Sequence, residues 1–324
     1  MALSFPEFVE LARAFQESRL VLTAIELDVF RAAGEGARAG DVAALLGTDS
    51  RATEALLNAL TASGAMTKEG DVFRNTPELA PFLAGGGESE ARKALLHTVN
   101  LWRTWSTLTE CVRAGKAVLP PGVEANDPDW RESFLAAMHR NAQVFAAEMV
   151  RRVDASRARR LLDIGGGSGA CAMAFARAHP GLDAEVLDLE AVLPITRRYI
   201  EQAGLSGRVR TRAGDLRADE FGSGYDLILL SAICHMLDPA ENRDLLARCR
   251  RALAAGGRLV VRDFILDAGK TSPKPAALFA LNMLVATRGG SSYSEDEYRA
   301  WLAEAGFARV ERPDPRGDLL VATA

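Results

Sequence analysis

The sequence predicts a two-part α/β protein, with a helical N-terminal part and a C-terminal part built on a mostly parallel sheet. From residue 160 onward, short apolar runs alternate with helical stretches, which is typical of a parallel sheet covered by helices on both faces. Within residues 307–324, two apolar runs are joined only by a Pro/Gly turn, too short for a parallel crossover, so they must pair antiparallel. A chain of 324 residues, 48% of them hydrophobic, can form two domains. We therefore expect a Rossmann-like sheet with an antiparallel terminal hairpin, preceded by a smaller helical domain.

The N-terminal part combines helical patterns with a short hairpin. Apolar residues recur at helical spacing over residues 4–33, with no strand pattern between them. A short helix follows, and then a second helix over residues 51–62 that Asp49 or Ser50 can cap. A two-stranded wing is expected around Gly70. This order of elements is typical of a winged helix.

A winged helix can read DNA or serve packing, and the charges favour packing. The second helix offers only Arg51 as a base, with Glu54 close by, whereas a DNA-reading helix needs a basic face. The formal net charge of -4 also argues against a general affinity for nucleic acid or anionic membrane. We favour a dimerisation role and keep a DNA-binding regulator as the minor alternative.

The middle of the chain predicts three helical pieces over residues 91–153, broken by the proline-containing stretch 117–129. The change of pattern near residue 155 marks the start of the sheet. We expect three regions: a helical, winged-helix dimerisation domain over 1–97, linker helices over 98–154 that contribute to a substrate pocket, and a ligand-binding domain over 155–324.

Composition indicates an ordinary cytoplasmic protein. The N-terminus carries Glu7 and Glu10 where a signal peptide needs positive charge, and no apolar stretch is long enough to span a bilayer. The cysteines stand far apart without a C-x-x-C pair, so we expect them to be reduced, with neither a disulfide framework nor a metal site. They are Cys111, Cys171, Cys234 and Cys249.

The glycine cluster at residues 165–169 follows the first apolar run of the sheet and opens a helix. In an open parallel sheet this loop approaches the ligand most closely, and glycines let the ligand touch the backbone. Gly165, Gly167 and Ala170 formally fit the dinucleotide pattern, with Asp188 at about the separation of a ribose-binding acid, so a nicotinamide dehydrogenase is a legitimate alternative.

Three features favour S-adenosylmethionine over a dinucleotide. Asp163, just ahead of the glycines, suits a cationic ligand better than a pyrophosphate. The stretch "RAGDL" ends the third strand with an acid and an apolar side chain, which suit an amino group and a flat ring. The antiparallel terminal hairpin is unlike the continuing parallel sheet of a dehydrogenase. S-adenosylmethionine has a sulfonium, an ammonium, a ribose diol and an adenine, and no phosphate.

The sequence resembles the S-adenosylmethionine-dependent small-molecule O-methyltransferases, which include caffeate and hydroxyindole enzymes and bacterial natural-product tailoring enzymes. The resemblance covers nearly the whole chain. It rests on the motifs "LLDIGGGSG", "LDLEAVL", "GDL", "LSAICHMLD", "GGRLVVRDFIL", "LNMLVATRGG" and "YSEDEYRAWLAEAGF". It implies a seven-stranded class I methyltransferase sheet and an N-terminal region that forms a homodimer.

The resemblance implies a role for each residue of the cofactor site. Asp163, Gly165 and Gly167 line the methionine portion, and Asp188 holds the ribose hydroxyls. Asp215 and Leu216 bracket the adenine. The remaining residues that we expect to border the cofactor are Leu189, Gly214 and Ser231. Taken one at a time, the acids could instead be strand-end caps and Leu216 could be part of the core.

His235 follows the fourth apolar run, so we expect it at the carboxyl edge of the sheet. A lone histidine is more often a packing or surface residue, but the resemblance implies that His235 is the general base of an in-line methyl transfer. An imidazole of pKa about 6.5 can take the proton of a phenol of pKa about 10 as the oxygen attacks the methyl group. Asp263 matches a family Glu that flanks this histidine; its alternative is a salt bridge with Arg262 or Arg258.

The chain departs from the family pattern at two places. The family's Asp and Trp after the histidine are Met236 and Leu237 here, and the second family acid is Ser292. The alternative function is therefore a S-adenosylmethionine-binding homologue with decarboxylase or hydroxylase activity, or with no methyl transfer.

We expect the acceptor pocket between the helix at residues 130–150 and the segment 279–290. Flat aromatic acceptors favour apolar and thioether walls with one or two polar anchors. The candidate lining residues, which could equally be core, are Phe134, Met138, His139, Asn282 and Met283.

Overall fold

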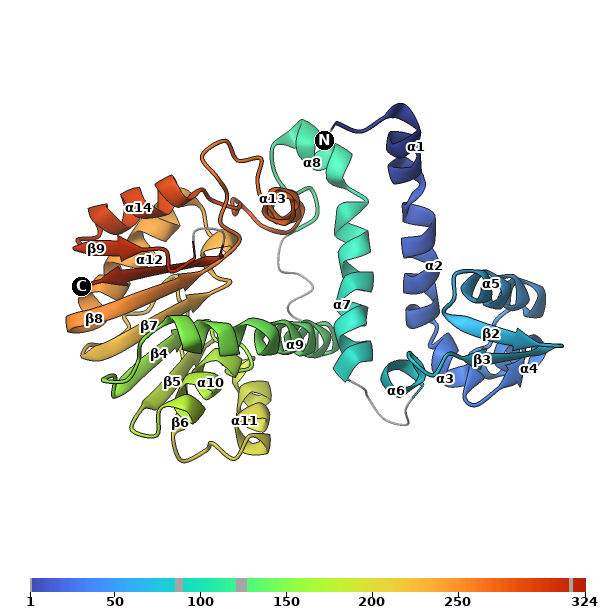
Figure 1. Ribbon diagram of the computed structural model, residues 1–324, viewed down its shortest axis with the longest axis horizontal. Coiled ribbons are helices and arrows are strands. Elements are labelled where there is room, and N and C mark those ends of the chain that lie inside the picture. The colour runs from blue at the N-terminus through green and yellow to red at the C-terminus, as the bar shows by residue number, and fades with distance from the viewer. Residues whose placement is uncertain (1, 85–89, 121–126, 315–316) are drawn as a thin grey trace. The chain divides into compact units, whose positions relative to one another are not determined.

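The computed structural model describes residues 2–84, 90–120, 127–314 and 317–324 (Figure 1). The chain forms two compact units, Met1–Trp102 and Arg103–Ala324. The region limits at residues 97 and 154 that we expect from the sequence stay a prediction. In the described parts of the chain, we find no helix with the length and apolar character needed to cross a membrane.

The first unit is helical with a small sheet. Its helices are α1 (Phe5–Arg13), α2 (Phe15–Glu26), α3 (Val29–Ala33), α4 (Ala39–Leu46), α5 (Ser50–Ala62), α6 (Ala80–Leu83) and most of α7 (Glu90–Trp105). Its strands are β1 (Ala37–Arg38), β2 (Met66–Glu69) and β3 (Val72–Asn75), in the order β1-β3-β2. The predicted α5 and the wing are confirmed, and the Asp49 side chain caps α5 by accepting from the Ala52 amide at 2.8 Å.

The helical pattern over residues 4–33 gives three helices rather than one. The chain leaves the helix after Arg13 and again at Asp28, whose φ of 64° lies in the left-handed region. Apolar spacing continues through both breaks, so the periodicity alone does not reveal them. Helices α2 to α5 and strand β3 enclose the core of this unit, with Ile25, Leu57 and Phe73 fully buried.

The second unit carries a seven-stranded sheet in the order β6-β5-β4-β7-β8-β10-β9. The strands are β4 (Arg160–Ile164), β5 (Asp183–Asp188), β6 (Val209–Ala213), β7 (Tyr225–Ser231), β8 (Leu253–Arg262), β9 (Arg309–Glu311) and β10 (Leu319–Thr323). Strands β4 to β8 pair in parallel, and β10 pairs antiparallel with both β8 and β9. The predicted class of sheet and its terminal hairpin are confirmed.

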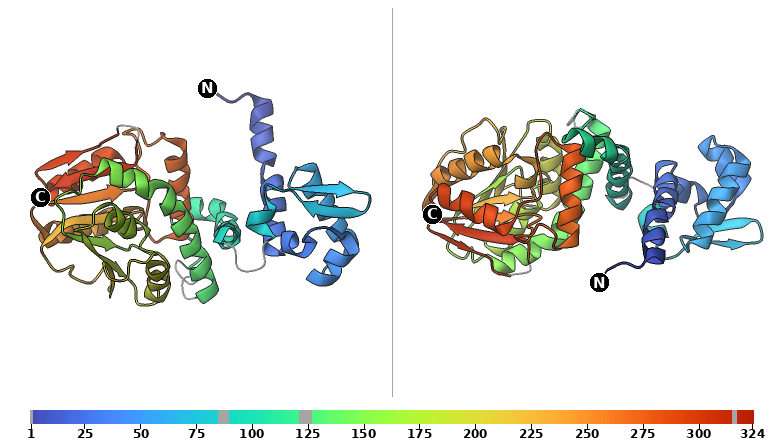
Figure 2. Two further views of the ribbon diagram at one scale, coloured as in Figure 1. Left: turned by 60° about the horizontal axis from the view of Figure 1, so that its bottom comes forward. Right: turned by 90° about the horizontal axis from the view of Figure 1, so that it is seen from above.

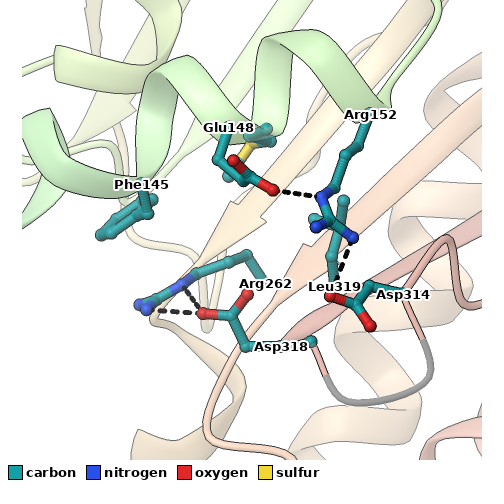
Figure 3. A pocket seen from close by; sticks show the side chains of 9 residues that line it. Phe145, Glu148, Arg152, Arg262, Asp314, Asp318 and Leu319 are labelled. Carbon is teal, nitrogen blue, oxygen red and sulfur yellow. Dashed lines mark hydrogen bonds and ion pairs between the residues drawn. The ribbon is translucent and has the colours of Figure 1, made fainter.

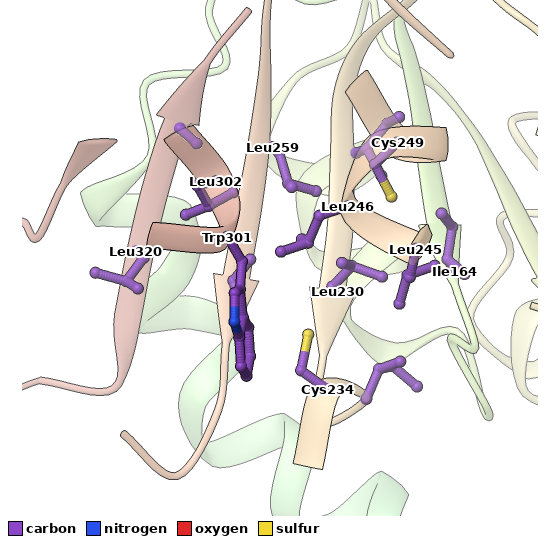
Figure 4. Close-up of a cluster of buried hydrophobic side chains, with 14 of the residues drawn as sticks. Ile164, Leu230, Cys234, Leu245, Leu246, Cys249, Leu259, Trp301, Leu302 and Leu320 are labelled. Atoms are coloured by element: carbon purple, nitrogen blue, oxygen red, sulfur yellow. The ribbon is translucent and has the colours of Figure 1, made fainter. Parts of the chain in front are cut away.

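Helices cover both faces of this sheet (Figures 1 and 2). The helices of the second unit are α8 (Leu108–Ala114), α9 (Pro128–Arg152), α10 (Ala170–Ala178), α11 (Leu193–Gln202), α12 (Pro239–Ala252), α13 (Lys274–Ala286) and α14 (Glu295–Glu304). Of these, α9, α10 and α11 cover one face of the sheet, and α12 and α14 cover the other. Alternate residues of β7 enter different cores: Leu229 packs with residues of α9 and α10, and Leu230 with residues of α12 and α14. Figure 4 shows the second core around Leu230, Leu246 and Trp301. Burial on both faces explains why the strands are continuous apolar runs.

The order of strands places the site. Strand β4 lies between β5 and β7: strands β5 and β6 are added on one side of β4, and strands β7 and β8 on the other. Ligands of open α/β sheets bind at such a switch point in the strand order. The carboxyl ends of the parallel strands therefore bring the glycine loop after β4 and the turn after β7 to one edge. The four cysteines are free and buried, as expected, and burial raises the pKa of the Cys171 thiol to about 12.

Candidate active site

The glycine loop between β4 and α10 excludes side chains for two separate reasons. Gly165, Gly167 and Gly169 have φ values of 64°, 56° and 75°, which disfavour residues with a Cβ. At Gly166 a Cβ would lie 2.8 Å from both the Asp163 carboxyl carbon and Val186 Cγ1. The loop therefore presents backbone rather than side chains at the carboxyl edge of the sheet.

Asp163 lies beneath this loop with 1% of its surface exposed. Its Oδ2 accepts a hydrogen bond from the Ala172 amide at 3.2 Å, whereas its buried Oδ1 has no hydrogen-bond partner among the described residues. Burial, together with the charge of Asp188, raises the pKa of Asp163 to about 7 although the Ala172 amide lowers it. A buried carboxylate with an unused oxygen suits a ligand that brings positive charge.

Asp188 and Leu189 end β5 beside the glycine loop. One Asp188 oxygen accepts from the Gly167 amide at 2.8 Å and the other from the Leu189 amide at 2.8 Å. Burial raises the pKa of Asp188, and the two amide hydrogen bonds oppose this rise. The Leu189 side chain is 53% exposed. The structure thus brings Asp188 to the glycine loop, as the spacing predicts.

The turn after β6 completes the same edge. The Gly214 amide donates to the Asp188 carbonyl at 3.0 Å, and the Asp215 side chain accepts from the Arg217 amide at 2.8 Å. Leu216 Cδ2 lies 3.5 Å from the position that a Gly165 Cβ would occupy.

Leu237 lines a cavity of about 60 Å³ together with Leu216. This is the position where the family has tryptophan, so aliphatic surface replaces an aromatic ring there. The other residues lining this cavity are Arg217, Glu241, Asp244 and Arg248.

The chain turns sharply after β7. Ser231 ends the strand, with its hydroxyl 3.8 Å from the Cys171 thiol, and Ala232 adopts a φ of 60°. A positive φ at a residue with a Cβ is uncommon and often lies at a functional site. This turn leads into a short 3-10 helix, η2 (Cys234–Met236), which carries His235.

His235 is held by Asp263, the first residue after β8. The Nδ1 atom of His235 lies 2.6 Å from Asp263 Oδ1, and the backbone amide of His235 donates to Oδ2 at 3.0 Å. Burial raises the pKa of Asp263, but the charge and hydrogen bonds of His235 outweigh it, so the pKa falls below the ordinary value. The alternative salt bridges are not formed: Arg262 pairs with Asp318, and Arg258 donates to the Asp154 carbonyl.

Two phenylalanines enclose the His235 ring. Phe264 and Phe279 stack on each other with centroids 3.7 Å apart, and both meet the imidazole edge-on. Phe279 comes from α13, which therefore packs over the ring. Neither phenylalanine is predicted from the sequence as a site residue, because aromatic residues at strand ends and on helices are usually core.

Gly290 is a further residue that the sequence analysis missed. A Cβ on Gly290 would lie 2.2 Å from the His235 carbonyl oxygen and 3.0 Å from the Met236 carbonyl carbon. The Gly290 amide donates to Thr287 Oγ1 at 2.9 Å, which closes the turn after α13. The Tyr293 hydroxyl donates to the Leu237 carbonyl at 2.5 Å. The segment around Gly290 therefore supports the turn that carries His235.

The five candidate acceptor residues fall into separate groups. His139 lies at the glycine loop, with Nδ1 2.8 Å from the Ser168 hydroxyl and its ring stacked on Tyr199. Phe134 stacks on Trp130 of the same helix. Asn282 accepts a hydrogen bond from the Trp105 indole at 2.8 Å. The two methionines differ in exposure: Met283 is buried and Met138 is half-buried.

A separate cavity of about 120 Å³ lies between α9 and the ends of β8 and β10 (Figure 3). Its arginines are already paired, since Arg262 contacts Asp318 at 2.7 Å and Arg152 contacts Asp314 at 3.1 Å. Among the described residues that line this cavity, the arginines are therefore already engaged by carboxylates. In the described part of the chain, no group of three or more His, Cys, Asp or Glu side chains is arranged to hold a metal ion.

A parallel sheet with helices on both faces, a glycine loop after β4 and acids at the ends of β4, β5 and β8 is typical of a nucleoside-binding enzyme of the class I methyltransferase type. Residues 105–308 match the family model of the O-methyltransferase domain, and residues 9–84 match that of the O-methyltransferase dimerisation domain. The chain therefore belongs to the O-methyltransferase family. It is an S-adenosylmethionine-dependent O-methyltransferase.

Known proteins are similar to this one over nearly the whole chain. One is the 3-hydroxy-5-methyl-1-naphthoate 3-O-methyltransferase of Streptomyces sahachiroi, 35% identical over 93% of this chain and 89% of that protein. Another is the N,N-dimethyltransferase OxyT of Streptomyces rimosus, 32% identical over 96% of this chain and 93% of that protein. The solved structure of PigF with SAH is similar with a TM-score of 0.90, at 28% identity over 99% of this chain and 100% of that chain.

The raised pKa of Asp163 predicts pH-dependent cofactor affinity. The free protein holds a proton on Asp163 below about pH 7, and a positive ligand favours the ionised form. Affinity for S-adenosylmethionine is therefore expected to rise between about pH 5.5 and 7.5, by up to about tenfold per unit below the pKa. Titration calorimetry checks this. Asp163→Asn is the control, expected to bind more weakly and with little pH dependence; a flat profile in the unmodified protein would contradict the prediction.

The contact of Gly290 predicts that Gly290→Ala displaces the His235 turn. The added Cβ meets backbone, which must shift, so the variant should lose about 1–3 kcal/mol of unfolding free energy and much of its turnover. Urea unfolding and release of S-adenosylhomocysteine measure the two effects. Gly207→Ala is the matched control, because a Cβ there meets nothing within 4 Å. Equal behaviour of the two variants would rule out the support role.

Proposed function

We propose that this enzyme methylates a hydroxyl group of a small aromatic, phenolic compound, with His235 as the general base. The observation that carries the proposal is the buried His235–Asp263 pair at the carboxyl edge of the sheet, the same edge as the glycine loop. General bases act where a titratable side chain and the bound reactants meet at one site.

The residues at the sheet edge fit the cofactor. The unused oxygen of Asp163 is suited to the cationic methionine portion, beside the backbone of Gly165 and Gly167. Asp188, held by two amides, is the acid for the ribose hydroxyls. The residues assigned to the adenine and to the border of the site are Leu189, Gly214, Asp215, Leu216 and Ser231. When bound, S-adenosylmethionine supplies an electrophilic methyl group.

Asp263 decides which nitrogen of His235 can accept a proton. Its lowered pKa keeps it ionised, so it accepts a hydrogen bond from Nδ1–H. The neutral imidazole then carries its lone pair on Nε2, and this atom takes the phenolic proton. The carboxylate also stabilises the imidazolium that results. A neutral phenol is a weak nucleophile, so removal of this proton assists its attack.

We propose an aromatic acceptor because the side chains that we assign to its pocket are mainly apolar. We assign Phe134, Met138 and Met283 to its apolar walls, and His139 and Asn282 to its polar anchors. The naphthoate named for the Streptomyces sahachiroi relative is an aromatic hydroxyl compound, which supports this substrate class. The name of OxyT describes methylation at nitrogen, so an amine acceptor is the first variation to test.

A second candidate function follows from the departures from the family pattern. Leu237 and Ser292 replace a tryptophan and an acid, and Ser292 is 2% exposed with a hydroxyl that has no partner among the described residues. Such a site could bind the cofactor and run a decarboxylation or hydroxylation, or perform no methyl transfer. Incubation with S-adenosylmethionine and a panel of phenols and aromatic amines separates the two candidates by release of S-adenosylhomocysteine.

Replacing the base should stop turnover and spare binding. His235→Asn is expected to lower methyl transfer by about 10²–10⁴-fold, because the proton acceptor is lost. Cofactor affinity should change by less than about twofold, since the glycine loop is intact. Both are measured on the same preparation, by S-adenosylhomocysteine release and by calorimetry. Unchanged turnover would remove His235 from the mechanism.

We also propose that the N-terminal unit forms a homodimer. None of the nine residues of α1, all of them described, is buried, and its apolar side chains include Phe5, Phe8 and Leu11 at 77%, 58% and 56% exposure. An exposed apolar stripe of this kind marks an interaction surface. The matched dimerisation-domain model covers residues 9–84 and supports a second copy as the partner.

Charges on α1 should dissociate this dimer. The double substitution of Phe8→Glu and Leu11→Glu places two charges in the proposed apolar interface and is expected to give a monomer. Light scattering after size-exclusion chromatography measures the mass. Val144→Glu, at a position 82% exposed in the second unit, should stay a dimer. A dimer that survives the double substitution would place the interface elsewhere.

A further inference from the structure

Asp263 receives four hydrogen bonds, two on each oxygen. Oδ1 faces His235 Nδ1 at 2.6 Å and accepts from the Phe264 amide at 2.8 Å. Oδ2 accepts from the His235 amide at 3.0 Å and from the Tyr298 hydroxyl at 3.2 Å. Three of these donors belong to His235 or to the residue after Asp263. The fourth comes from α14, far away in the sequence.

Tyr298 is fixed for this contact. It has no exposed surface, and its ring packs edge-on against Tyr293 and Trp301. The start of α14 is secured by a capping box between Ser294 and Glu297. Burial first, and then the charge of Asp263, raise the pKa of Tyr298 well above its ordinary value, so the hydroxyl keeps its proton and remains a donor.

We propose that Tyr298 is a positioning residue that acts through Asp263 to set the orientation and the basicity of His235. The inference rests on the proposed role of His235 as the base. The Tyr298 hydroxyl and the His235 imidazole both form hydrogen bonds to the Asp263 carboxylate, so they share its negative charge. Without the Tyr298 hydroxyl, more of that charge acts on His235, the imidazolium is favoured, and the pKa of His235 rises.

The other groups near Asp263 add no further charge. Cys234 of η2 also has a hydrogen bond with the Tyr298 side chain, and burial raises the pKa of its thiol well above the ordinary value, so the thiol stays neutral and is only a weak donor. Arg262, the residue before Asp263, is engaged with Asp318 and lies over the Phe145 ring. Ser292 stands where the family has its second acid. Among the described residues, the hydrogen bonds to Asp263 therefore influence how strongly its charge acts on His235.

The test is an NMR titration of the histidine ring in the ligand-free, full-length protein, which needs no turnover. The His235 signals are those lost in His235→Asn. In Tyr298→Phe the pKa of His235 is expected to rise by about half a unit. The acid limb of kcat/KM should move by the same amount, with the acceptor KM within about twofold.

Tyr225→Phe is the matched control, because its hydroxyl also donates to a carboxylate, Glu185, at 2.6 Å. It removes the same chemical group at the start of β7, and the pKa of His235 should not move. An unmoved pKa in Tyr298→Phe, or an equal rise in both variants, would overturn the inference.

A second variant covers the case in which Tyr298→Phe does not fold. Site-specific 3-fluorotyrosine at position 298 keeps the ring and makes the hydroxyl a stronger donor, so the pKa of His235 should fall. A rise or no change would overturn the inference. The proposed function is judged separately, since loss of turnover is measured in His235→Asn while the titration reports the Tyr298–Asp263–His235 coupling.

Discussion

The active site depends on one buried interaction, the two-point attachment of His235 to Asp263. The same carboxylate accepts from the ring and from the backbone amide of His235, so it fixes both the side chain and the turn that carries it. Neighbouring elements close this turn from other sides: the Asn242 amide donates to the Cys234 and Leu237 carbonyls, and Gly290 packs against the backbone. The proposed base, held in this way, would lose little rotamer freedom when the substrates bind.

Most of the fold follows from local signals that the sequence contains. Strands buried on both faces must be continuous apolar runs, and a two-residue gap with Gly70 must be a hairpin, so these elements are predictable. The breaks in the helical stretch 4–33 are not, because the left-handed backbone at Asp28 carries no signal in apolar spacing. Strand β1 (Ala37–Arg38) is missed for a related reason: two residues have no periodicity, and only pairing with β3 makes them a strand.

The candidate site also contains some residues that the sequence predicts and others that it does not. Gly165, Asp188 and His235 lie at strand ends, and the topology of a parallel sheet brings such positions to one edge. The contact of His139 with the glycine loop cannot be predicted in this way. Its helix is correctly predicted, but only tertiary packing reveals that its ring meets Ser168 of the glycine loop. Tyr298 likewise looks like a core aromatic on an amphipathic helix until its hydroxyl is found on Asp263.

A carboxylate acts on a nearby imidazole through its negative charge, to the extent that other donors do not already neutralise it. The absence of the second family acid therefore need not weaken His235 as the proposed base. Ser292 contributes no charge, which leaves Asp263 as the carboxylate beside His235. With four donors, Asp263 stays ionised even when fully buried, as its lowered pKa indicates. Leu237 differs, because an aliphatic side chain cannot reproduce the face of an indole. Under the proposed assignment of the adenine site, this departure would weaken adenine binding and leave proton transfer unaffected.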